Sequence, residues 1–111
     1  MNAGDDVTLK QLRAILALSN HRHFRRAAEE LGVTQPSLSA QIQNLESALQ
    51  VRLVDRARGG VSLTPVGREI AARARRILEE ERAMRDYAAS AKTGLAGTIR
   101  LGAAPTVGPY L

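Results

Sequence analysis

Hydrophobic residues recur at helical spacing from the start of the chain. A first helix is expected over residues 9–20, preceded by Thr8 and with Gln11 three residues after it. This spacing is typical of a capping box, in which each side chain accepts a hydrogen bond from the other residue's backbone N–H. The apolar face of this helix carries Leu9, Leu12 and Leu16.

A short second helix and a longer third helix follow, separated by a tight turn. The second is expected over residues 24–31 and ends at Gly32, which can adopt the left-handed conformation that closes helices. Thr34 can cap a third helix over residues 35–49, where Pro36 is tolerated because first-turn N–H groups have no acceptor within the helix. The apolar positions of the second helix are Phe24, Ala27, Ala28 and Leu31. Those of the third helix are Leu38, Ile42, Leu45 and Leu49.

A β-hairpin is expected after the third helix. The short apolar runs over residues 51–54 and 61–63 are typical of strands, and Gly59 and Gly60 between them are typical of a turn. The three helices and this hairpin would together form a first domain over residues 1–64.

A long helix is expected to follow, over residues 65–92. Thr64 can cap this helix and Pro65 occupies its first position, which is a favoured arrangement. At the helical rise it would span about 40 Å, which is more than so small a domain can cover with its own side chains. We therefore predict a linker helix that pairs with a second copy of the chain.

A seven-residue repeat along this long helix favours helix-to-helix packing. The repeat comprises Leu63, Ile70, Ile77, Met84 and Ala91. Ala74 and Ala88 line its edge, where their small size would let two helices approach closely, whereas Glu81 interrupts that edge. The dimerisation residues that we predict are Ile70, Ala74, Ile77, Met84 and Ala88. The alternative is a helix that folds back on its own domain.

The last segment, residues 93–111, is typical of a hinge and the first strand of another domain. Gly94 and Gly97 mark the hinge, and apolar and polar residues alternate over residues 98–101. So short a segment cannot bury a core of its own. We expect it to open an effector-binding domain that lies beyond this chain, and we expect residues beyond about Gly94 to be disordered here or held only by contacts with another molecule.

The second and third helices, with the short turn between them, have the pattern of a helix-turn-helix. In such pairs the second helix enters the major groove of DNA, where Gln and Asn can pair with adenine edges and Ser can donate or accept. The buried stripe of the third helix leaves small or amide-bearing side chains facing outward. These are Pro36, Ala40, Gln43 and Ser47, flanked by Gln35, Ser37, Ser39 and Asn44. The alternative is a generic three-helix bundle with a solvated polar face.

Arginines around the hairpin favour the DNA-binding interpretation. Arg52, Arg56 and Arg58 flank the glycine turn, and a hairpin that carries arginines beside a recognition helix is typical of a wing. Such arginines can reach a narrow minor groove or the flanking phosphates. Arg25 and Arg26, at the start of the second helix, are expected to contact the DNA backbone on the opposite side.

Composition narrows the class of partner. The 111 residues are 44% hydrophobic but only 3% aromatic, so the core must be built mainly from aliphatic side chains. A formal net charge of +5 suits a polyanion such as nucleic acid or an acidic membrane surface. The absence of cysteine excludes disulfides, thiolate metal sites and cysteine nucleophiles within this chain. A polar, acidic start and the lack of any long apolar run lead us to expect a cytoplasmic location and no membrane partner.

A series of motifs extends in one register from Leu9 to about Lys92. They are Phe24-x-x-Ala27-Ala28-x-x-Leu31, Val33-Thr34-Gln35-Pro36-Ser37-Leu38-Ser39, Gln41-Ile42-x-x-Leu45-Glu46, Leu53-Val54-Asp55-Arg56 and Leu63-Thr64-Pro65-x-Gly67. Together they resemble the N-terminal signature of the LysR family of transcription regulators. The resemblance implies a mainly α fold, a winged helix-turn-helix followed by a long dimerising helix, with a periplasmic-binding-protein-like effector domain after it.

The same resemblance implies a function and a set of contact residues. It implies a regulator that binds pseudo-palindromic double-stranded DNA as a two-fold homodimer, and as a tetramer at full length, without a cofactor. The resemblance places Gln35, Pro36, Ser37, Ser39 and Ala40 where the family reads bases, and residues 56–58 in the wing. With the positions that the pattern above singled out, the residues expected to contact DNA are Arg25, Arg26, Thr34, Gln35, Pro36, Ser37, Ser39, Ala40, Gln43, Arg56 and Arg58. Ala40 departs from the family pattern, because many members carry a longer polar or basic residue there. This departure argues against a strong guanine contact at Ala40.

Two further segments resemble the OxyR-type, peroxide-sensing branch of that family. They are His21-Arg22-His23-Phe24-Arg25-Arg26-Ala27-Ala28 and Pro105-Thr106-Val107-Gly108-Pro109-Tyr110-Leu111. The resemblance implies that a small effector or peroxide acts through the absent C-terminal domain, with Thr106 near the peroxide.

Other classes of function have less support in the sequence. The spacing of His21 and His23 relative to Glu29 and Glu30 does not suit a metal site. No Ser–His–acid arrangement and no glycine-rich phosphate loop points to an enzyme. Two alternatives remain open: a helical protein–protein interaction module, and another winged-helix regulator of the MarR type.

Overall fold

The structure, a computed structural model, describes residues 6–57 and 60–97 of the chain. Its elements are α1 (Leu9–His21), α2 (Phe24–Leu31), α3 (Gln35–Leu49), β1 (Val54–Ala57), β2 (Gly60–Leu63) and α4 (Pro65–Gly97). Within those residues the fold is mainly α with one two-stranded antiparallel sheet, as predicted. The chain forms two compact units, Met1–Leu78 and Glu79–Leu111, which divide within α4. Arg58, Thr106 and the strand expected over residues 98–101 lie outside the described residues.

Threonine residues begin three of the described helices, which confirms the predicted helix starts. Thr8 Oγ1 accepts the backbone N–H of Gln11 at 3.2 Å, and Gln11 Oε1 accepts that of Thr8 at 3.0 Å, which completes the capping box. Thr34 and Thr64 each accept the backbone N–H three residues further on, at 3.2 and 2.9 Å. Such caps satisfy N–H groups that have no partner within the helix. At the far end of α2, Gly32 adopts the predicted left-handed conformation, with φ of 69°.

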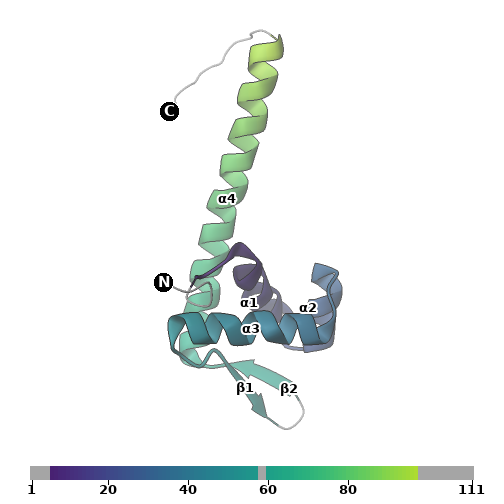
Figure 1. Cartoon of the computed structure of the whole chain (residues 1–111), viewed down its shortest axis with the longest axis vertical. Helices are drawn as coiled ribbons and strands as arrows, with labels where there is room; N and C mark the ends of the chain where they lie inside the picture. The colour runs from purple at the N-terminus through teal and green to yellow at the C-terminus, as the bar shows by residue number, and fades with distance from the viewer. Residues whose placement is uncertain (1–5, 58–59, 98–111) are drawn as a thin grey trace. The chain divides into compact units, whose positions relative to one another are not determined.

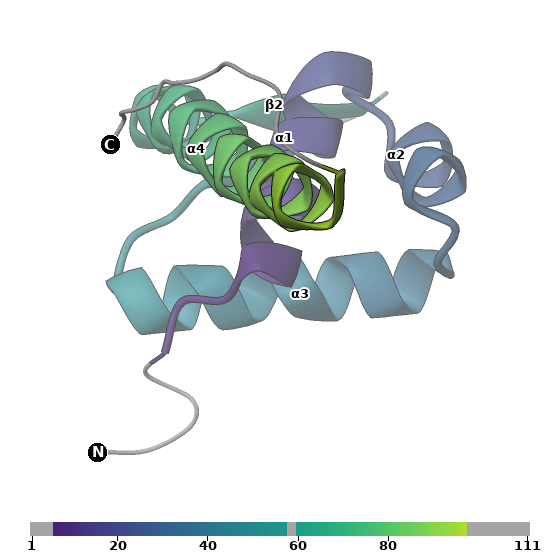
Figure 2. The same cartoon turned by 90° about the horizontal axis from the view of Figure 1, so that it is seen from above.

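The hydrophobic core lies where α1, α2, α3 and the first part of α4 meet. In Figure 1 α1 lies behind α3, and in both views α2 lies near the end of α3 to which the turn connects it (Figure 1, Figure 2). The largest fully buried side chains are Ile15, Leu18, Leu38, Ile42, Leu45 and Leu53. Burial of each such aliphatic side chain contributes roughly 1.5–3 kcal/mol, so a chain with few aromatics still has a substantial core.

The hairpin begins later than the sequence pattern predicted. Val54 pairs with Leu63, and the expected first strand over residues 51–54 is wrong except at its last residue. The reason is that the backbone N–H groups before β1 are directed to α3 rather than to a partner strand. The Glu46 carboxylate accepts those of Leu53 and Val54 at 2.8 and 3.2 Å, and its backbone carbonyl accepts that of Val51 at 3.2 Å.

The first turns of α4 lie directly against the backbone of Leu53. A Cβ added at Gly67 would lie 2.0 Å from the Leu53 carbonyl oxygen, which also accepts the backbone N–H of Thr64 at 2.9 Å. Ala71 and Ala74 continue the same helix face and are 3% and 1% exposed. Ala74 therefore packs in the core of its own domain, which corrects its expected place at the edge of a dimer seam.

The remaining predicted seam residues differ in exposure. Ile70 is half-buried against the core, whereas Ile77 and Met84 are 48% and 64% exposed. Ala88 is also exposed. Of the five predicted dimerisation residues, Ile77, Met84 and Ala88 are therefore accessible, and their contact with a second copy of the chain stays a prediction.

α4 continues to Gly97, beyond the expected end at Lys92. No proline interrupts this stretch, and a glycine such as Gly94 within a helix costs only about 1 kcal/mol relative to alanine.

In the second unit, Arg85 donates a hydrogen bond to Glu81 one turn earlier. That hydrogen bond, and then the opposite charge, raises the pKa of Arg85 above its ordinary value. None of the helices over the described residues has the length and hydropathy needed to cross a membrane.

Candidate nucleic-acid interface

α3 has one apolar and one polar face. Leu38, Ile42 and Leu45 have no exposed surface and anchor the helix on the core. Six of the residues predicted to contact DNA on α3 or at its N-cap are exposed. They are Thr34, Gln35, Pro36, Ser37, Ala40 and Gln43. These positions are accessible as predicted, and their contacts with bases stay a prediction.

The N-terminal end of α3 is suited to an anionic surface. No acidic residue lies in its first turn, and the N–H groups at a helix start carry partial positive charge. Pro36, Ser37 and Ala40 near this end have small side chains, so the helix can lie deep in a groove of its partner. Thr34 differs from its neighbours because its hydroxyl oxygen already caps the helix by accepting the Ser37 N–H.

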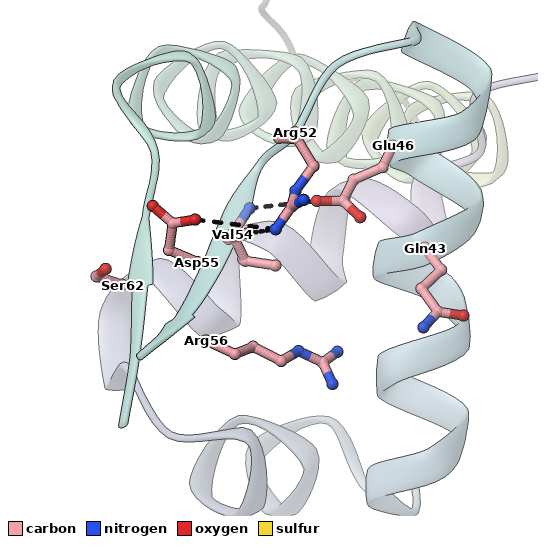
Figure 3. Close-up of a pocket in the computed structure, with 7 residues that line it drawn as sticks. All are labelled: Gln43, Glu46, Arg52, Val54, Asp55, Arg56 and Ser62. Atoms are coloured by element: carbon pink, nitrogen blue, oxygen red, sulfur yellow. Dashed lines mark hydrogen bonds and ion pairs between the residues drawn. The ribbon is translucent and has the colours of Figure 1, made fainter. Parts of the chain in front are cut away.

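A cleft of about 550 Å³ lies between α3 and the hairpin. It is lined by Gln43, Glu46, Arg52, Val54, Asp55, Arg56 and Ser62. Figure 3 shows Arg56 extending from the hairpin toward α3, whereas Arg52, Glu46 and Asp55 lie toward the other end of the cleft. α3 and the hairpin therefore form two walls of one concave surface.

Arg56 is held by contacts with two helices. Its Nη2 donates to the Ser39 hydroxyl oxygen at 3.0 Å, and its guanidinium carbon lies 4.7 Å from the centroid of the Phe24 ring. The second distance is within the range of a cation–π interaction. Ser39, expected at the flank of the polar face, is half-buried, and its hydroxyl oxygen accepts this bond while its O–H group keeps a donor. Phe24 was expected only as an apolar residue of α2, because no local pattern connects positions so far apart in sequence.

Both acidic side chains of the cleft have partners. Glu46 accepts the two backbone N–H groups that precede and begin β1. Asp55 Oδ1 lies 3.8 Å from Arg52 Nη2 in an exposed pair, and such pairs contribute little to stability. These contacts compensate the two carboxylates locally, which lessens their repulsion of an approaching phosphate.

The two residues of α2 that are predicted to contact the DNA backbone lie at the start of the helix. Arg25 and Arg26 are exposed in the first turn of the helix. Nearby, His21 Nε2 lies 2.6 Å from Glu30 Oε1 and links the end of α1 to α2. Within residues 6–57 and 60–97, no three His, Asp or Glu side chains group so as to hold a metal ion.

Comparisons with known proteins agree with this arrangement. Residues 9–68 match the family described as bacterial regulatory helix-turn-helix protein, lysR family. A probable hydrogen peroxide-inducible genes activator of Streptomyces viridosporus is 42% identical over 104 residues, which cover 94% of this chain and 33% of that protein. The DNA-binding transcriptional dual regulator OxyR of Escherichia coli K12 is 39% identical over 105 residues, which cover 95% of this chain and 34% of that protein. The chain thus spans about a third of the length of these curated relatives.

Solved structures share the fold. A full-length OxyR from Pseudomonas aeruginosa is 41% identical with a TM-score of 0.74, over 77% of this chain and 29% of that one. The DNA-binding domain of CbnR, solved in complex with DNA, is 34% identical with a TM-score of 0.72, over 77% of this chain and 98% of that one. Family match, sequence identity and fold agree, and the chain belongs to the LysR family of bacterial helix-turn-helix regulators.

Proposed function

We propose that this chain binds pseudo-palindromic operator DNA as a two-fold dimer, with α3 in the major groove. The observation that carries the proposal is the exposed polar face of α3 beside an arginine-bearing hairpin, across one concave surface. The major groove, about 12 Å wide, admits a helix, and the net charge of +5 favours a polyanion. The chain acts by binding rather than by catalysis, and we assign it to the cytoplasm, where bacterial operators lie.

Each part of the surface has a separate role in this proposal. Gln35 and Gln43 contact base edges, whereas Arg25 and Arg26 contact phosphates next to the start of α2. The hairpin contacts the DNA backbone or minor groove beside α3. Amide side chains distinguish adenine through paired hydrogen bonds, and phosphate contacts carry no sequence information directly.

The dimer that we propose uses the exposed part of the α4 seam. Ile77 in the first unit, and Met84 and Ala88 in the second, are exposed in the single chain; Ile77 and Met84 belong to the seven-residue repeat of the sequence. Two-fold symmetry follows from the proposed operator, because the two half-sites of a palindrome present the same surface in opposite orientations.

Selection from a randomised duplex pool, followed by fluorescence anisotropy on the selected duplex and on a scrambled one, tests the proposal. Gln35→Ala should weaken binding to the selected duplex by about 1–3 kcal/mol and leave binding to the scrambled duplex unchanged. Asn20→Ala, which removes an exposed amide on α1, is the matched control and should alter neither affinity. Equal losses of Gln35→Ala on both duplexes would refute the base-reading role of α3.

We further propose that this domain serves a peroxide-responsive regulator. The relatives named hydrogen peroxide-inducible genes activators support this step. The chain contains no cysteine, so a thiol switch would belong to another part of the protein. DNase footprints of a protein of the relatives' full length, with and without peroxide, test the proposal. A footprint that ignores peroxide and responds to a small metabolite would contradict it and leave the family assignment unchanged.

A further inference from the structure

We propose that Phe24 and Ser39 are positioning residues that hold the Arg56 guanidinium ready for a DNA phosphate in the cleft between α3 and the hairpin. The inference rests on the proposed DNA-binding function and goes beyond it. It assigns a role in DNA affinity to Phe24, an aromatic side chain that needs no contact with the nucleic acid.

Three elements fix the position of Arg56. The side chain starts from β1, its guanidinium carbon lies 4.7 Å from the Phe24 ring centroid on α2, and its Nη2 lies 3.0 Å from Ser39 Oγ on α3. Phe24 is itself half-buried against the hydrophobic core, so the ring is a fixed platform. An arginine side chain loses considerable rotamer freedom when it is immobilised. Contacts that order it before binding reduce the cost that DNA binding would otherwise carry.

The two arginines that line the cleft differ in how far their charge and their N–H donors are paired within the protein. Arg52 lies near the Asp55 carboxylate at 3.8 Å and donates to the Val54 carbonyl oxygen at 3.4 Å. Arg56 forms no ion pair with an acidic residue anywhere in the described part of the chain, and the group that accepts its hydrogen bond is the neutral hydroxyl of Ser39. A guanidinium has five N–H donors, so Arg56 keeps both its charge and most of its donors for an anion.

The geometry of the cleft favours a phosphate as that anion. Figure 3 shows the Arg56 guanidinium directed into the cleft at the end away from Glu46 and Asp55. A planar guanidinium binds phosphate oxygens in pairs through parallel N–H groups. Most protein–DNA hydrogen bonds go to phosphate oxygens and sugars rather than to bases, so a phosphate is the group that this guanidinium would meet beside α3.

A double-mutant cycle tests the inference on a mixed-sequence duplex, because a phosphate contact is independent of sequence. Phe24→Leu keeps an apolar side chain but removes the aromatic face, and should weaken binding roughly two- to fivefold, the range of an exposed cation–π contact. Phe24→Tyr keeps the face and should restore binding. In an Arg56→Gln background, Phe24→Leu should cause no additional loss. Leu31→Val, a conservative change at another half-buried position of α2, is the control and should leave affinity unchanged.

The order of the Arg56 side chain in the free protein provides a readout that a purely structural role would not change. The Arg56 Nε–Hε resonance should show restricted motion by NMR relaxation, and Phe24→Leu and Ser39→Ala should each increase that motion. An equal loss of affinity from Phe24→Leu with and without Arg56 would overturn the inference, as would an Arg56 signal that is mobile in the unaltered protein. Failure of the unaltered protein to bind any duplex would instead refute the proposed function, and the inference would fall with it.

Discussion

Gly67→Ala sets two physical effects against each other at the start of α4. In an ordinary helix, replacement of glycine by alanine stabilises by about 1 kcal/mol, because glycine has the greater backbone freedom to lose. Here the added Cβ would lie 2.0 Å from the Leu53 carbonyl oxygen and 2.9 Å from its carbonyl carbon. These atoms belong to a backbone segment whose side chain is fully buried, so they cannot rotate away. The helix or the segment must move.

The magnitude follows from what that movement disturbs. Overpacking costs typically 1–3 kcal/mol, and loss of the 2.9 Å hydrogen bond from the Thr64 N–H to the same carbonyl adds about 1 kcal/mol. After the gain in helix propensity, we expect a net loss of roughly 1–3 kcal/mol. In a domain of this size each kcal/mol lowers Tm by roughly 4–8 °C.

Urea and thermal unfolding followed by circular dichroism measure the change. Gly32→Ala is the control, because nothing lies within 4 Å of its Cβ position and only the left-handed backbone, with φ of 69°, opposes the substitution. That strain costs roughly 1–2 kcal/mol. A Gly67→Ala protein as stable as the unaltered protein, or more stable, would refute the steric argument and show that helix propensity outweighs the clash.

Three other predictions concern assembly, the hairpin and salt. Ile77→Asp places a charge on an exposed apolar position of α4, and sedimentation should show a monomer where the unaltered chain forms a dimer; an unchanged mass would place the interface elsewhere. Glu46→Ala removes the acceptor of the Leu53 and Val54 N–H groups, and should lower the free energy of unfolding by about 1–3 kcal/mol; Glu46→Gln keeps an acceptor oxygen and should lose less, so equal losses would contradict the hydrogen-bond account. Duplex affinity should fall steeply with salt because phosphate contacts release counterions, and Arg56→Gln should reduce the slope of log K against log salt; an unchanged slope would remove Arg56 from the phosphate contacts.

The helical part of the fold could be predicted because its determinants are local. Thr8, Thr34 and Thr64 begin helices through contacts that reach only three residues along the chain. Gly32 ends α2 through its own backbone conformation. The periodicity of the apolar residues then placed the exposed face of α3, since core packing follows the same spacing.

The features that the sequence did not predict depend on distant partners. The hairpin was expected to begin at Val51, whereas Glu46 draws the intervening N–H groups to α3 and delays the first strand. Ala74 fits a heptad seam by spacing, but the close approach at Gly67 turns that face of α4 into the core. The residue at which a strand begins, and the face of α4 that packs in the core, depend on tertiary contacts, which cannot be predicted from a local sequence pattern.

The separation of α3 into a buried face and an exposed face has an evolutionary consequence. Leu38, Ile42 and Leu45 hold the helix with no exposed surface, while Gln35 and Ala40 lie on the exposed face. Substitutions at such exposed positions usually change stability by no more than about 0.5 kcal/mol. Under the proposed function, a duplicated gene could therefore acquire a new target sequence through changes at these positions, because they would leave the stability of the domain nearly unchanged. Divergence of regulators after duplication would then be limited by the supply of useful operators rather than by folding.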